Sequence, residues 1–249
     1  MNKTQYLNTD SDLLSPYLLL DTSRQTTALR EACSIIEREL DKDNHVSMQL
    51  LDLGCGAGNS CDAFRKWGAG IEWIGMDIVM SPEVSCRTRN DATFISYDGV
   101  NIPLHDESMD VIYSHQVFEH VRRPSELLSQ AFRVLRPGGC LVGSTSHLEP
   151  YHSHSHWNFT PYGFASLLTE AGFSDVHIRP GIDGLTLILR RLLSYARIRL
   201  GKWFFEHESP LNAFIEMVGC AGGMQVRRRA MIKLLFCGHF IFSARKPNE

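Results

Sequence analysis

The sequence predicts an α/β protein built on a mostly parallel β-sheet with helices on both faces. Two observations lead to this prediction. Short apolar runs typical of buried strands alternate with segments of helical periodicity, and such alternation is typical of parallel strands joined by helical crossovers. The first strand-like run, residues 50–53, also ends in a loop with glycine at every second position. Because parallel sheets bind ligands at the carboxyl ends of their strands, we expect the functional residues at that edge.

The expected elements follow one another in a regular order. Strands are expected near residues 48–53, 71–76, 93–97, 109–114, 139–145, 173–180 and 236–245. Helices are expected near residues 22–40, 59–67, 80–87, 124–135, 161–172, 185–205, 209–219 and 224–235. Thr160 followed by Pro161 is typical of a helix start, because threonine caps helices and proline suits the first turn. About 55 residues separate the last two strands, so we expect a helical insertion between them.

Length and composition indicate one domain. The 249 residues fit a single core with an insertion. We expect a loosely held arm at residues 1–20, a core at 22–182, a helical insertion or lid at 183–235, and a last strand with a tail at 236–249. No apolar run reaches the roughly 18 residues of a membrane span. The seven cysteines show no zinc or disulfide spacing, so we expect a cytoplasmic protein with reduced thiols.

The glycine loop indicates a nucleotide-like ligand. Gly54, Gly56 and Gly58 permit left-handed backbone and close approach of a ligand, and the helix after them points free N–H groups at it. The third glycine comes one residue earlier than in the dinucleotide fingerprint, and Asp52 suits an ammonium group better than a pyrophosphate. Asp77 ends the next strand, where a carboxylate can bind ribose hydroxyls. The alternative is a glycine-rich turn and an unrelated surface aspartate.

Four segments, taken together and in order, give the chain a specific resemblance. They are residues 52–58, 75–77, 98–121 and 133–139. With these motifs the chain resembles the class I S-adenosylmethionine-dependent methyltransferases, in the type 11-like group that modifies small molecules. The resemblance covers about residues 48–146. It implies a Rossmann-like, doubly wound sheet of seven strands, mostly parallel with an antiparallel last strand, and S-adenosyl-L-methionine as the cofactor.

The resemblance also implies roles for individual residues. Those implied to bind the cofactor are Asp52, Gly54, Cys55, Gly56, Gly58, Asp77, Ile78, Asp98, Gly99 and His115. The glycines would close on the methionine part and Asp77 would take the ribose. Asp98 would contact the adenine amine, while Ile78 and Ile102 would pack on the adenine faces. For Asp98 the alternative is a turn-forming Asp-Gly pair.

Histidines are frequent where the acceptor should bind. His115 ends the fourth strand and is placed to approach the sulfonium, whereas His120 fits a packing or capping role at least as well as catalysis. A hydroxyl acceptor needs a base, and the histidine-rich segment after the fifth strand offers His152 first and His147 second. His152 and the histidines two and four residues later, together with Glu149, would also suit a metal. One loop seldom supplies a whole site, so we expect no metal.

The charge is divided along the chain. Residues 1–182 carry a net charge of −9 and residues 183–249 a net charge of +6. A basic, apolar-faced segment at 185–205 would suit a lipid-linked substrate or an anionic membrane at the inner face. The other interpretation is a lid that leaves its arginines in solvent. The acidic chain and the lack of an aromatic–basic module argue against nucleic acid. The oligomeric state stays open.

These observations predict a methyltransferase that acts on a small molecule, most simply by O-methylation. The loop at 149–161 is similar to that of bacterial enzymes of surface-glycan synthesis, which suggests a sugar hydroxyl, free or lipid-linked. Alternatives are carbon or nitrogen methylation of a quinone-like or secondary-metabolite acceptor, and an inactive subunit that binds the cofactor. A nicotinamide dehydrogenase is a competitor from another class.

Overall fold

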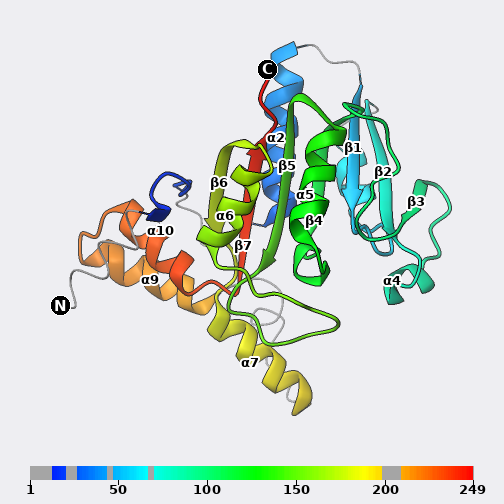
Figure 1. Cartoon of the computed structure of the whole chain (residues 1–249). Coiled ribbons are helices and arrows are strands. Elements are labelled where there is room, and N and C mark those ends of the chain that lie inside the picture. Colours follow the sequence, from blue (N-terminus) through cyan, green and yellow to red (C-terminus); the bar gives the residue numbers. More distant parts are fainter. Residues whose placement is uncertain (1–12, 21–26, 44–46, 67–69, 198–208, 249) are drawn as a thin grey trace.

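The core of the protein is a seven-stranded sheet in the order β3-β2-β1-β4-β5-β7-β6 (Figure 1). The computed structural model describes residues 13–20, 27–43, 47–66, 70–197 and 209–248. The strands are β1 Met48–Leu53, β2 Ile71–Ile78, β3 Thr93–Tyr97, β4 Met109–His115, β5 Leu135–Ser146, β6 Ser174–Pro180 and β7 His239–Arg245. β7 runs antiparallel to both neighbours, and the other pairs are parallel. The predicted sheet is confirmed, and its strand order reverses between β1 and β4, where such folds bind ligands.

Helices cover both faces of this sheet (Figure 1). They are α2 Ala28–Asp43, α3 Cys61–Arg65, α4 Pro82–Ser85, α5 Pro124–Val134 and α6 Pro161–Glu170, with a 3-10 turn, η1, at Phe118–His120. α2 and α3 bury one apolar cluster against the sheet, while α5 and α6 share the other. Phe118, Phe164 and Phe242 are fully buried in the second cluster, with ring centroids 4.7 to 5.9 Å apart. This packing fixes η1 against the carboxyl edge of the sheet.

Residues 13–20 correct the prediction of a loose arm at 1–20. Leu14 and Leu18 are buried, and Leu18 pairs in a parallel bridge with Ile178 of β6. The main chain of Ile178 bonds Tyr17 and Leu19 at 2.7 and 3.1 Å. The segment therefore lies along the free side of β6 and satisfies main-chain groups that would otherwise be open. Residues 1–12 lie outside the described part.

Three helices form the insertion between β6 and β7: α7 Gly184–Tyr195, α9 Pro210–Ala221 and α10 Val226–Leu235. The predicted helix at 185–205 is too long within the described residues, because α7 ends at Tyr195 and Arg197 has a left-handed φ of 54°. Residues 198–208 lie outside the description. Likewise, β7 starts at His239 and not at 236, since Phe236 caps α10. No described helix is both long enough and apolar enough to cross a membrane.

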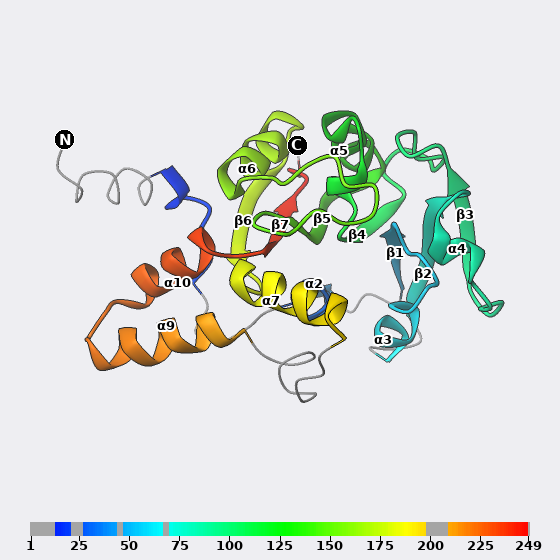
Figure 2. The same cartoon turned by 90° about the horizontal axis from the view of Figure 1, so that it is seen from below.

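Buried polar contacts hold the helices of the insertion together. Asp183 caps α7 by accepting hydrogen bonds from the main chain and hydroxyl of Thr186 at 2.6 and 2.7 Å, and from the hydroxyl of Ser209. Glu216 of α9 pairs with Arg229 at 2.9 Å and with the buried Lys233 of α10. Seen from below in Figure 2, α7 lies beneath the middle of the sheet, with α9 and α10 to one side and α4 to the other. The insertion therefore reaches the carboxyl edge.

Candidate functional site

The glycine loop between β1 and α3 has the backbone that the sequence predicts. Gly54, Gly56 and Gly58 have φ values of 77°, 51° and 81°, a region that L-residues rarely adopt. The N–H groups of Gly54 and Cys55 both donate to the carbonyl oxygen of Met76, at 2.7 and 3.1 Å. A Cβ at Gly54 would lie 2.2 Å from Val117, which follows β4. Glycine at position 54 therefore lets the loop pack closely against Val117, and a side chain there would disturb this packing.

Asp52 supports this loop from behind. Its carboxylate is almost fully buried and accepts a hydrogen bond from the hydroxyl of Ser60, just before α3, which in turn accepts one from the indole of Trp73 at 3.2 Å. Burial raises the pKa of Asp52 to about 7. The side chain thereby fixes the exit of the loop, and a direct contact with a cofactor ammonium stays a prediction. Burial also raises the pKa of Cys55 to about 12, so this thiol is neutral.

Asp77 joins the ends of β1 and β2. Its Oδ2 accepts the N–H of Gly56 and its Oδ1 the N–H of Ile78, both at 2.7 Å. Burial raises the pKa of this carboxyl, against the effect of those two donors. Ile78 is exposed, and its side chain is 3.6 Å from where a Cβ of Gly99 would lie. The structure therefore brings Asp77, Ile78 and Gly99 together at one corner, as a nucleoside site requires.

Asp98 forms a turn at the end of β3. Its Oδ1 accepts the N–H groups of Val100 and Asn101 at 2.8 and 2.6 Å, and its Oδ2 accepts the amide of Asn101 at 2.6 Å. These bonds lower the pKa of Asp98. Asp98 therefore stabilises this turn, and its contact with the adenine stays a prediction. Ile102 is buried in the core, so its expected packing on the adenine is wrong in this conformation.

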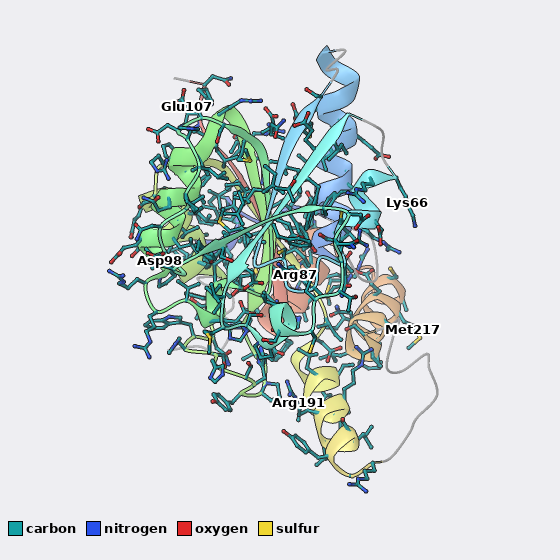
Figure 3. All side chains as sticks on the ribbon, turned by 90° about the vertical axis from the view of Figure 1, so that its right-hand side faces the viewer. Lys66, Arg87, Asp98, Glu107, Arg191 and Met217 are labelled. Atoms are coloured by element: carbon teal, nitrogen blue, oxygen red, sulfur yellow. The ribbon has the colours of Figure 1, made fainter. Side chains whose placement is uncertain are left out.

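Arg87 is a contact to the glycine loop that the sequence analysis did not identify. Its Nε and a terminal nitrogen donate to the carbonyl oxygen of Gly56 at 3.0 and 2.6 Å, and its guanidinium lies 3.8 Å from the ring centroid of Phe94. In Figure 3, Arg87 and Asp98 lie above Arg191 of α7, whereas Glu107 lies at the opposite end of the sheet. No motif marks Arg87, because its contact depends on how the chain folds back after α4.

His115 and Gln116 lie where β4 ends. The Nδ1 of His115 is 2.6 Å from the hydroxyl of Ser144 on β5. Although part of its surface is open to solvent, protein atoms surround the ring at the strand end, and this lowers its pKa to about 4. Gln116 has a φ of 56° and donates its side-chain amide to the same hydroxyl at 3.1 Å. His115 is therefore a neutral imidazole at the sheet edge, and the strained Gln116 is a functional candidate that its sequence context did not reveal.

Glu149 is the centre of the second half of the site. Its Oε2 lies 2.6 Å from Nε2 of His239 and accepts the hydroxyl of Ser146 at 2.5 Å, while its Oε1 is 3.4 Å from Nδ1 of His152. Burial opposes ionisation, but the contacts with His239 and Ser146 outweigh it and lower the pKa of Glu149. His239, the first residue of β7, pairs with Ser146 of β5. No local motif marks His239, because 90 residues separate it from Glu149.

The remaining predicted histidines are placed separately. His147 bonds the main chain at both ends: its Nδ1 lies 2.9 Å from the carbonyl oxygen of Phe159, and its N–H donates to Gly238 at 2.7 Å. Burial lowers the pKa of its ring. His152 meets Glu149 and the edge of the His120 ring. Among the described residues, the alternative metal grouping within one loop, against which the sequence analysis decided, is not formed, because His152 lies with Glu119 and His120 instead.

A large cavity lies away from these residues. It has a volume of about 720 Å³ and is lined by residues at the amino ends of β4 and β5 and the end of β7, among them Asp110, Arg136 and Arg245. Two of its arginines are already engaged, Arg136 with Asp110 and Arg245 with Glu39. The glycine loop and the carboxylates of Asp77, Asp98 and Glu149 all lie at the other end of the sheet. We therefore place the functional site at the carboxyl edge.

Comparisons with known proteins agree with this placement. A family model described as a methyltransferase domain matches residues 51–143. An uncharacterized methyltransferase of Mycolicibacterium vanbaalenii is 34% identical over 116 residues, 45% of this chain and 45% of its own. A ubiquinone biosynthesis O-methyltransferase of Bradyrhizobium sp. is 29% identical over 137 residues, 53% of each chain. The chain thus spans about half the length of the curated relatives it matches.

A solved structure shares the fold. Phosphoethanolamine N-methyltransferase 2 of Haemonchus contortus, in complex with phosphomonomethylethanolamine and S-adenosylhomocysteine, matches with a TM-score of 0.54 at 16% sequence identity. The match covers 88% of this chain and 52% of that chain. At this identity the likeness concerns the fold alone, which agrees with the strand order and the position of the glycine loop.

Proposed function

Because residues 51–143 match the family model of a methyltransferase domain, we propose that this protein transfers a methyl group from S-adenosylmethionine to a hydroxyl group of a small-molecule acceptor. One observation carries the proposal. The glycine loop and the histidine–carboxylate group around Glu149 lie on the same edge of one sheet, and Val117 and His115 connect them. Cofactor-binding and proton-accepting groups are thus adjacent.

The cofactor half of the site is built from main-chain groups and carboxylates. Gly54, Gly56 and Gly58 offer a surface without side chains to the methionine part, and Asp77 is positioned for the ribose hydroxyls. When bound, the cofactor supplies an electrophilic methyl group on a sulfonium. Such a transfer needs little covalent help, so the protein contributes alignment of the acceptor and exclusion of water. The neutral ring of His115 borders that position without placing a second positive charge beside a sulfonium.

For a hydroxyl acceptor, we assign proton removal to His239. Glu149 holds its Nε2 at 2.6 Å, which orients the ring, stabilises the imidazolium formed on proton uptake and leaves Nδ1 available. His152, the first candidate from the sequence, meets the same carboxylate at 3.4 Å and is the second candidate. His147 is third, because main-chain partners hold it. The first two assignments are proposals based on contacts with Glu149, and the third is based on the contact of His147 with the carbonyl oxygen of Phe159.

The acceptor that we favour is a sugar hydroxyl, free or on a lipid-linked glycan. α7 supports this proposal: Leu192 and Tyr195 are 61% and 79% exposed, and no acidic residue occurs within 184–197. Arg191, beside Leu192, is 38% exposed and lies 3.9 Å from Oε1 of Glu149, so it links this helix to the site. An apolar stripe with arginines suits an anionic membrane at which lipid-linked substrates are found. A quinone-like acceptor is the second candidate, because one relative is a ubiquinone biosynthesis O-methyltransferase.

Binding and turnover test the proposal separately. We expect S-adenosylmethionine and S-adenosylhomocysteine, but not NAD, to raise the melting temperature of the protein. With a panel of sugar, glycolipid and quinol acceptors, we expect release of S-adenosylhomocysteine. His239→Ala should lower kcat about 100-fold, the contribution typical of a general base, and leave cofactor affinity within about twofold. His105→Ala, an exposed histidine at the other end of the sheet, is the control. Cofactor binding without turnover on every acceptor would indicate an inactive partner subunit.

A further inference from the structure

Glu119 and His120, to which the methyl-transfer proposal assigns no role, form a group with His152. Glu119 and His120 belong to η1, and His152 comes from the loop after β5. One potential ligand atom of each lies within 4.8 Å of the others. Ligands of a tetrahedral ion with bonds of about 2.1 Å lie roughly 3.4 Å apart. A small movement of the His152 loop would therefore bring the three atoms to coordination distance.

Glu119 is a buried carboxylate that lacks a cationic partner among the described residues. It is fully buried, and its Oε2 accepts a hydrogen bond from the hydroxyl of Thr145 at 2.9 Å. Its Oε1 lies 3.2 Å from the hydroxyl oxygen of Ser146, whose proton is donated to Glu149. A buried carboxylate is stabilised by a proton or by a cation. Each oxygen of Glu119 keeps at least one lone pair and can still ligate a cation.

The two histidines are oriented as metal ligands usually are. Nδ1 of His152 faces the carbonyl oxygen of Pro150 and Oε1 of Glu149, both at 3.4 Å, so the other ring nitrogen is left as an acceptor. His120 is bonded to the main chain of His154, which likewise occupies one ring nitrogen. The two rings are nearly perpendicular, with centroids 5.2 Å apart. Outer partners of this kind fix the tautomer and direction of histidine ligands.

From this arrangement we infer that Glu119, His120 and His152 bind one divalent transition-metal ion. Two imidazoles and one carboxylate suit zinc and related ions that accept mixed nitrogen and oxygen ligands, and they leave coordination positions open. The ion would lie beside the Glu149 and His239 pair. If the proposed O-methylation holds, an acceptor hydroxyl on an open position would lose its proton more readily. The binding itself does not depend on that reaction.

Calorimetric titration of the metal-free full chain with Zn²⁺ tests the inference. We expect one site per chain, and a Kd at least about tenfold weaker in His152→Ala and in His120→Ala, a loss of the size seen when metal sites are disturbed. His156→Ala is the matched control, because that side chain is exposed on the same loop and outside the group. Its titration should match the parent chain.

A second readout keeps the test independent of folding and of catalysis. Co²⁺ bound to the parent chain should give visible absorption bands typical of mixed nitrogen–oxygen coordination, and His152→Ala should lose them while its circular dichroism and S-adenosylmethionine binding stay unchanged. No stoichiometric binding, or equal binding by the parent chain and both histidine variants, would overturn the inference. Metal binding by a chain that does not bind S-adenosylmethionine would uphold it and refute the methyl-transfer proposal.

Discussion

The two halves of the carboxyl edge are built in different ways. At the ends of β1, β2 and β3, the important contacts involve main-chain groups: Asp77 accepts two N–H groups, and Asp98 accepts two more within its own turn. At the ends of β4 and β5, side chains from distant segments meet, as Glu149 does with His239. The first half depends on local backbone conformation, and the second on the tertiary arrangement of the strands.

This difference has a functional consequence. A cofactor shared by many enzymes can be bound by a fixed backbone loop, because glycine and a few carboxylates suffice for its common parts. An acceptor that varies between enzymes needs side chains that can be exchanged without disturbing the fold. We therefore expect substitutions in the first half to affect cofactor binding and stability, and those in the second half to affect turnover.

The largest effect should come from Gly54→Ala. The new Cβ would meet Val117 at 2.2 Å and sit on a backbone with φ of 77°, so we expect a loss of about 3 kcal/mol in the free energy of unfolding together with loss of cofactor binding. Urea unfolding and calorimetry measure both. Gly223→Ala is the control, since φ there is 67° but nothing lies within 4 Å; it should cost about 1 kcal/mol. Equal costs for the two variants would show that contact with Val117 is unimportant.

Asp77→Asn should have the next largest effect. It removes the charge that we assign to the ribose hydroxyls while keeping one acceptor oxygen for the loop. Charged hydrogen bonds contribute about 1.5–3 kcal/mol, so cofactor affinity should fall roughly 10- to 100-fold. Asp106→Asn is the control, an exposed aspartate paired with Arg133 at the opposite edge. If equilibrium dialysis finds unchanged affinity in Asp77→Asn, this carboxylate serves only to hold Gly56.

The smallest effect should be a pH dependence that traces to Asp52. Its pKa of about 7 in the folded chain means that it is neutral at pH 6 and ionised at pH 8. If the charged form attracts the ammonium group of the cofactor, affinity should rise by up to about tenfold between pH 6 and pH 8 and level off above that. Asp52→Asn should remove this component. A slope that persists in the variant would exclude Asp52 as its source.

The pH dependence of folding stability that comes from Asp52 should have the opposite sign to that of cofactor affinity. The folded pKa is raised above the ordinary value of 3.8, so the folded chain binds the proton more tightly than the unfolded chain does. The stabilisation from neutral Asp52 is present below pH 4 and is lost as pH rises to about 7. Relative to Asp52→Asn, the parent chain should therefore lose stability across that window in urea unfolding.

Much of the cofactor half could be predicted from sequence because its information is local. Strands β1 and β3 have the predicted bounds, since apolar runs between turn residues mark them. Gly54, Gly56 and Gly58 predict a loop with left-handed backbone by residue type alone. Arg87 could not be predicted, because its contact with Gly56 depends on the path of the chain after α4. The arm at 13–20 was also missed, because its burial comes from pairing with β6, 160 residues away.

The sequence by itself determined the fold class, the strands of the cofactor half and the glycine loop with its carboxylates, because periodicity and glycine conformations act within a few residues. Only the tertiary structure decided which histidines meet which carboxylates. His239 reaches Glu149, and His152 reaches Glu119 and His120, through strand pairing and η1 packing that bring distant segments together. Such contacts are fixed by the collective packing of the sheet, which no short stretch of the chain encodes.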